Sequence, residues 1–153
     1  SKKYFQIEKY QITPLANFQL VARVLGAKSY RTDREAELSP VDLALGWGPM
    51  SKPKNLDKLS ISQSNRWYHW RTNDFPIPRR DIETNSANMH FIPANSAIES
   101  KLKSVGAGDI VKLKGYLVHI DGDDGWKWSS SMTRNDTGGH SCEVILLEDI
   151  TTI

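Results

Sequence analysis

A long strand near the C-terminal end of the chain constrains the fold more than any other sequence feature. Residues 109–120 are rich in β-branched and other apolar residues that alternate with lysines, and Gly115 lies among them. A glycine inside a long strand indicates a bulge or a sharp coil, the device with which small barrels close. The Asp- and Gly-rich residues 121–125 predict a turn, and residues 126–128 predict a return strand with two tryptophans on one face.

Other apolar segments predict further strands. They lie at residues 18–25, 61–71, 88–92 and 142–147. Pro14 cannot donate a backbone hydrogen bond, so it is expected to interrupt any strand that begins before residue 18. The single strand expected over residues 61–71 has no clean apolar face, so each of its aromatic side chains must pack beside polar neighbours.

Capping residues and apolar periodicity predict two or three short helices. Ser39 suits the N-cap and Pro40 the first helical position, so a short helix is expected over residues 39–45. The clearest helix begins at about residue 96 and ends before Gly106, with its apolar residues on one face. A third helix is expected over residues 79–86.

Length, charge and cysteine content narrow the class of protein. The chain has 153 residues, a formal net charge of +2 and one cysteine. This length fits one domain, residues 1–153, and a single cysteine excludes an intrachain disulfide framework and a Cys-rich zinc site. The near-neutral balance argues against a protein that coats DNA. The charge is uneven, however, because residues 49–103 are basic and residues 104–153 are acidic.

Four long motifs resemble a family of uncharacterised bacterial proteins. These motifs span residues 38–50, 61–66, 88–95 and 130–138. The resemblance covers nearly the whole chain and implies a membrane-anchored or exported protein with an apolar N-terminal segment. Because the chain begins at Ser1 without a methionine, we expect an anchor or signal to have been removed from it. The resemblance implies no catalytic residue; it favours the cell envelope, with the cytoplasm left open.

The region from Gly108 onward is loosely similar to oligonucleotide- and oligosaccharide-binding (OB) barrels. The similarity rests on the Gly-Asp start, the coiled strand with Gly115 and the hairpin that follows. It implies a fold and no ligand. The expected fold is therefore α+β and mainly β: an antiparallel OB-like barrel with two or three short helices.

A basic and aromatic segment predicts a binding surface. Residues 51–80 carry seven basic against two acidic residues, and aromatic residues interleave with them, as on platforms that bind single-stranded nucleic acid or sugars. An anionic polymer, a glycan or a protein is the expected partner. Alternatively, the tryptophans are part of the hydrophobic core. Trp67 and Trp70 lie on opposite faces of the expected strand, so at least one of them points inward. The candidate binding residues are Trp47, Arg66, Trp67, His69, Trp70 and Arg71.

Two other functions stay open. In a hydrolase, His69 or His90 would act as the base, and Asn88, Arg134 or Asp136 would position the substrate. In a purely structural envelope component, the long motifs would serve folding, as the Gly- and Trp-rich residues 46–49 suggest. We favour binding over catalysis.

No metal or cofactor is expected. His140 and Cys142 lie close in sequence, but the chain lacks the ligand spacing of a zinc site. The acidic turn that begins at Asp121 has Trp126 and Met132 where a calcium loop needs glycine and an acidic residue.

Overall fold

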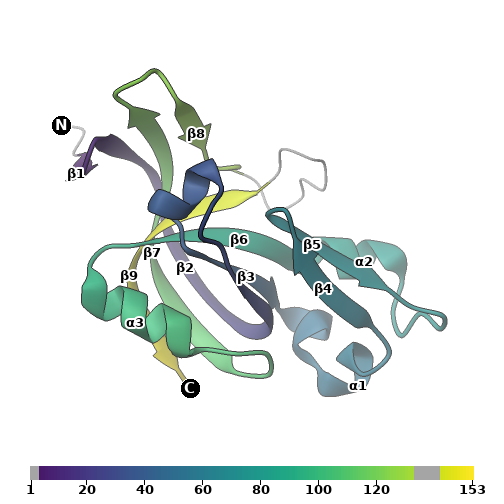
Figure 1. Ribbon diagram of the computed structural model, residues 1–153. Helices are drawn as coiled ribbons and strands as arrows, with labels where there is room; N and C mark the ends of the chain where they lie inside the picture. Colours follow the sequence, from purple (N-terminus) through teal and green to yellow (C-terminus); the bar gives the residue numbers. More distant parts are fainter. Residues whose placement is uncertain (1–3, 133–141) are drawn as a thin grey trace.

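Five strands form a closed circuit of backbone hydrogen bonds. The computed structural model describes residues 4–132 and 142–153. In it the strands pair in the order β2–β3–β6–β9–β7, and β7 pairs back to β2 (Figure 1). Two short strands, β1 and β8, extend this sheet to seven strands. The bounds are β1 Phe5–Ile7, β2 Tyr10–Ser29, β3 Val41–Gly46, β6 Ser86–Pro93, β7 Ile110–Gly122, β8 Lys127–Ser129 and β9 Glu143–Thr152.

The sheet is mixed. β6 and β9 pair in parallel, whereas the other neighbours in the ring are antiparallel. The prediction of a mainly-β α+β fold is confirmed, and the prediction of a purely antiparallel sheet is wrong. A parallel pair needs a crossover connection, and helix α3 (Ser96–Ser104) with strand β7 supplies it between β6 and β9.

Three short α-helices accompany the sheet within the described residues. α1 (Pro53–Leu56) and α2 (Arg79–Thr84) lie in the connection between β3 and β6, and the third is α3. The Asn95 side chain caps α3 by accepting a hydrogen bond of 3.0 Å from the backbone N–H of Ile98. The helices predicted near residues 79–86 and 96–105 are confirmed.

The helix predicted over residues 39–45 is wrong, because this segment is strand β3. All six of its residues are buried. Val41, Leu43 and Leu45 point into the ring, whereas Asp42 lies on the outer face of the strand. This period of two matches a strand, and pairing with β2 and β6 on both sides outweighs the local capping signal.

The single strand predicted over residues 61–71 is a hairpin. β4 (Ser60–Ser64) and β5 (Trp67–Arg71) pair antiparallel as a separate two-stranded sheet. Asn65 and Arg66 form the two-residue turn, with φ of 53° and 68°. Positive φ at both turn positions matches the twist of a tight hairpin, and asparagine tolerates it well.

Irregularities in two strands allow the ring to close. β2 continues through Pro14, contrary to the prediction, because its pairing with β7 shifts register between Pro14 and Ala16. The predicted irregularity at Gly115 is confirmed by a register shift between Lys114 and Gly115. A Cβ at Gly115 would collide with the carbonyl oxygen of Leu146 on β9, so only glycine fits this close approach.

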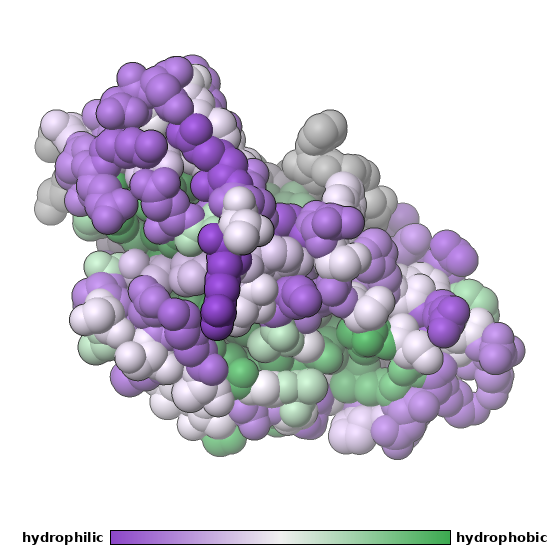
Figure 2. Space-filling view, in the orientation of Figure 1, coloured by the Kyte–Doolittle hydropathy of each residue, from purple (hydrophilic) through white to green (hydrophobic). Residues whose placement is uncertain are grey.

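Three hydrophobic clusters hold the elements together. The first fills the ring with side chains from all five strands, and Ile98 and Leu102 of α3 cover it. The second lies outside the ring, beneath the extension formed by β7 and β8. The third lies under hairpin β4–β5, and Figure 2 shows hydrophobic surface near β4 and α1 below a mainly hydrophilic upper lobe.

Candidate functional site

The outer face of hairpin β4–β5 carries three of the candidate binding residues in one row. Trp67, His69 and Arg71 alternate along β5 and are exposed, and the Trp67 side chain is 41% exposed. Their cross-strand partners on β4 are serines. The Ser64 Oγ lies 3.2 Å from the His69 Nε2, which orients this ring. The row is therefore both accessible and ordered.

The inner face of the same hairpin is apolar and packs against the ring. Tyr68 and Trp70 pack against the third hydrophobic cluster. Of the two tryptophans of β5, Trp70 therefore points inward and Trp67 points outward. The Tyr68 hydroxyl donates a hydrogen bond of 3.2 Å to the Ser86 Oγ, and burial raises the pKa of Tyr68. One strand thus carries an anchoring face and an exposed face.

A cavity of about 430 Å³ lies beside the exposed row. Arg79 of α2 places its guanidinium 5.2 Å from the Trp70 ring centre and 5.9 Å from that of Phe75. These contacts combine a cation with two aromatic faces. The lining residues are Tyr68, His69, Trp70, Arg71, Thr72, Phe75, Arg79 and Glu83.

Arg66 lies in the hairpin turn but points inward. Its guanidinium donates to both oxygens of Asp33, at 2.7 and 2.9 Å, and to Asp42 Oδ1 at 2.7 Å. Its Cζ also lies 4.1 Å from the ring centre of Tyr30. Although burial opposes the charge, the Asp33 and Asp42 carboxylates hold the pKa of Arg66 above its usual value. Only 12% of this side chain is exposed, so its role is to fasten the hairpin.

Asp42 is the centre of a buried polar network on the outer face of β3 and β6. Its Oδ2 accepts a hydrogen bond of 3.0 Å from Asn88 Nδ2, and its Oδ1 lies 2.9 Å from His90 Nδ1. Gln63 of β4 donates to Asn88 Oδ1 at 2.9 Å and so ties the hairpin to the network. Asn88 and His90, two candidate site residues, are thereby brought together with Arg66.

His90 is nearly enclosed. Trp128 of β8 packs against the imidazole with ring centres 5.2 Å apart. Burial opposes a charge on this ring, but hydrogen bonds to Asp42 and to the Cys142 sulfur raise the pKa of His90 to about 9. The imidazole is therefore protonated at neutral pH, held between a carboxylate and a thiol.

The other candidate residues lie elsewhere. His69 is exposed on the hairpin and does not join the network around His90. Trp47 is partly buried against the core of the ring. Arg134, Asp136 and His140 lie outside the described residues. Asp33, Asp42 and Cys142 are partners that sequence reasoning missed. The alternation of residues 41–45 could have indicated a strand with Asp42 on one face, but not the partners of Asp42.

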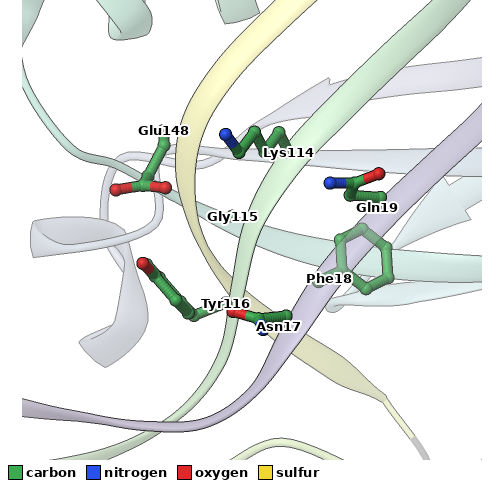
Figure 3. Close-up of a pocket in the computed structure, with 7 residues that line it drawn as sticks. All are labelled: Asn17, Phe18, Gln19, Lys114, Gly115, Tyr116 and Glu148. Atoms are coloured by element: carbon green, nitrogen blue, oxygen red, sulfur yellow. The ribbon is translucent and has the colours of Figure 1, made fainter.

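A second cavity, of about 490 Å³, lies where β2, β7 and β9 meet around Gly115 (Figure 3). Lys114 and Glu148 bring opposite charges to its rim, and Tyr116 and Asn17 lie at the other side of the view. By comparison, the cavity beside the hairpin is lined by two arginines and three aromatic side chains. The hairpin cavity is therefore the better candidate for an anionic ligand.

Neither a scan against models of protein families nor a search of curated proteins found a match for the chain. Across residues 4–132 and 142–153, no three His, Cys, Asp or Glu side chains are grouped so that they could hold a metal ion. No helix in that part of the chain is long and apolar enough to cross a membrane.

Proposed function

We propose that hairpin β4–β5 is a non-catalytic binding surface that holds an anionic polymer along its outer face. One observation carries the proposal: Trp67, His69 and Arg71 form an exposed row beside a cavity that is lined by Arg79 and three aromatic side chains. An indole face stacks on a base or a sugar, and a guanidinium pairs with phosphate, sulfate or carboxylate. The repeat along the strand suits a ligand with repeating units.

The charges of the hairpin support an anionic ligand. Arg71 has no ion pair within the described part of the chain, and the pair from Arg79 to Glu83 is long and exposed, at 3.9 Å. Carboxylates of the acidic C-terminal block pair with other cations: Asp121 with Lys127, Asp124 with Arg34 and Asp149 with Lys101. These carboxylates therefore leave the hairpin cations available.

The topology supports an OB-like barrel as the scaffold. Five strands close into a ring, and α3 lies between β6 and β7. OB folds bind ligands on the face of their second and third strands and on adjacent loops. The corresponding strands here are β3 and β6, and hairpin β4–β5 packs over their outer face. The ligand would then lie on the exposed side of the hairpin.

Fluorescence titration of the five tryptophans tests the proposal. The probes are a single-stranded oligodeoxythymidine, a sulfated polysaccharide and a neutral glucan. We expect one of the two anionic probes to bind, with an affinity that falls as salt rises. Trp67→Ala and Arg71→Ala should each weaken binding about tenfold, since one stacked ring or one phosphate contact is worth about 1–3 kcal/mol.

Arg31→Ala is the matched control, because it also removes one exposed positive charge and lies outside the hairpin. It should leave the affinity nearly unchanged. If no probe binds, or if the control weakens binding as much as Arg71→Ala, the proposed surface is wrong. A cellular defect that appears on deletion of the gene and not with the hairpin variants would instead favour a purely structural role.

We also propose that the module works in the cell envelope. The support is the resemblance of the four long motifs to bacterial proteins that carry an apolar N-terminal segment. Fractionation of cells that express the full-length gene product should recover it with membranes or the periplasm. Recovery in the cytosol alone would contradict this location.

A further inference from the structure

Three adjacent strands bring a carboxylate, an imidazole and a thiol together outside the ring. Asp42 on β3 is the register partner of His90 on β6. Cys142 directly precedes β9, whose first residue, Glu143, pairs with Met89 of β6. The sheet order β3–β6–β9 therefore places the three side chains in the order Asp42, His90, Cys142.

From this arrangement we propose that Cys142 is a nucleophile, that His90 is its acid–base partner and that Asp42 positions His90. The substrate class is an ester or a thioester of a small acyl group, which the thiol accepts. This activity is independent of ligand binding on the hairpin. A thiol, an imidazole and an orienting carboxylate are the parts from which cysteine acyl-transfer sites are built.

The contacts of Asp42 and His90 fit a carboxylate that positions an imidazole. The Nδ1 of His90 lies 2.9 Å from Asp42 Oδ1, and the parallel pairing of His90 with Val144 places Cys142 on the same outer face of the sheet. Arg66 donates to the same oxygen of Asp42, and Asn88 donates to its Oδ2. Because both oxygens of Asp42 are held, this carboxylate can fix the orientation of His90.

The three residues differ in burial, and burial decreases from Asp42 through His90 to Cys142. Asp42 is completely buried and His90 is 3% exposed. Cys142 is only partly buried and forms no disulfide. Cys142 is therefore the least buried member of the group.

The backbone around Cys142 is held in place. The Ser131 N–H donates to the Cys142 carbonyl oxygen at 2.9 Å, and Val144, the second residue of β9, donates its N–H to Ser130 Oγ at 3.0 Å. Trp128 packs against His90 and limits its rotation. A fixed thiol beside a fixed imidazole reduces the entropy lost in reaching the reactive geometry.

The charges around His90 favour its protonated form. Asp42 and Cys142 contact the His90 ring, Arg66 shares the Asp42 oxygen with it, and Asp33 lies beyond Arg66. The raised pKa of His90 keeps this ring protonated at neutral pH. A protonated imidazole can donate a proton to the leaving group of an acyl transfer.

The proposed step balances without an oxidant or a metal. The Cys142 sulfur forms a bond to the carbonyl carbon, and the bond from that carbon to the leaving oxygen or sulfur breaks. His90 gives a proton to the leaving group and takes up the proton that the thiol loses. The products are S-acylated Cys142 and an alcohol or a thiol.

The first experiment uses the wild-type chain and 4-nitrophenyl acetate. Cys142 is the only cysteine, so thiol acylation reports on this site alone. At pH 7 the folded chain should release 4-nitrophenol at least about tenfold faster than the same chain unfolded in urea, and should gain the mass of one acetyl group. Continued release would also support the site, since the acyl group then passes to water. A folded thiol that reacts no faster than the unfolded one overturns the proposal.

Variants assign the roles. His90→Gln should lower the acylation rate to that of the unfolded chain. Asp42→Asn should alter the pH profile of acylation, which a merely structural residue would not do. The matched control is His119→Gln, which breaks another imidazole–carboxylate pair, 3.3 Å from Asp121, and should leave the rate unchanged. A folded His90→Gln variant that keeps the wild-type rate overturns the role of His90.

Discussion

His90 couples the buried network to the pH of the solvent. Its imidazole is 3% exposed and takes part in the contacts with Asp42 and Cys142. In the folded chain its pKa is raised from 6.5 to about 9, so folding and protonation favour each other. The resulting stabilisation is fully present below about pH 6.5 and is lost as the pH rises through about 9.

The free energy of unfolding should therefore decrease between about pH 6.5 and 9. For a group shifted from 6.5 to about 9, the loss is on the order of 3 kcal/mol. Urea denaturation across this range, on wild type and on His90→Gln, measures it. If both proteins lose the same free energy over the range, the stabilisation does not come from His90.

At the same scale, Asp42 illustrates what a single sequence conceals. Ser39 and Pro40 form a good local signal for a helix start, and in isolation Asp42 suits the first turn of that helix. The partners that decide the matter are Arg66 and His90, which lie far away in the sequence. No local pattern encodes such contacts. Asn88 and His90 could therefore be named as candidate site residues from the sequence, whereas Asp42, which contacts both, could not.

Among the elements, β7 shows what local pattern does predict. Its alternation and the interior Gly115 were sufficient to predict a long strand with an irregularity. Hairpin β4–β5 was predicted as one strand, because the turn consists of only Asn65 and Arg66 and has no glycine. A strongly periodic segment can therefore be predicted, whereas a two-residue reversal within it is easily missed.

Gly115 allows β7 and β9 to approach closely, and this gives a prediction for the element. In Gly115→Ala the new methyl group would collide with the Leu146 carbonyl oxygen, and the backbone of β9 would have to move. We expect a loss of about 3 kcal/mol in the free energy of unfolding, at the upper end for overpacking.

The control for this prediction is Gly106→Ala, because a Cβ at Gly106 has no atom within 4 Å. Its stability should change by less than about 1 kcal/mol. Thermal denaturation of both variants makes the comparison. Equal melting temperatures for the two variants would mean that the backbone of β9 moves to accommodate the methyl group without a loss in the free energy of unfolding.

For the whole molecule, the ring and the hairpin differ in how they are held. The ring is closed by backbone hydrogen bonds, whereas hairpin β4–β5 is a separate sheet joined to it by side chains such as Arg66 and Gln63. Local opening requires less free energy where fewer backbone bonds and buried contacts must break. We therefore expect the hairpin to open before the ring unfolds.

Native-state hydrogen exchange measures this difference. Amides of β4 and β5 should exchange with an opening free energy at least about 1–2 kcal/mol below that of β7 and β9. Arg66→Ala should widen the gap, since it leaves Asp42 buried without its guanidinium. The same opening free energy in all four strands would show that hairpin and ring unfold as one unit.

The connection between β3 and β6 has a consequence for how this chain could be engineered. Gly46 and Ser86, which bound the 47–85 segment, are register partners in the ring. Directly opposed residues of an antiparallel pair lie only about 5 Å apart, so a tight reverse turn could replace the whole segment without altering the order of the ring. The shortened chain would lack Arg66 and Gln63 and would expose Asp42, Asn88 and His90 to water. Hairpin β4–β5, α1 and α2 thus form a replaceable insertion, and a substitute that keeps Asp42 buried must bring a cation to it.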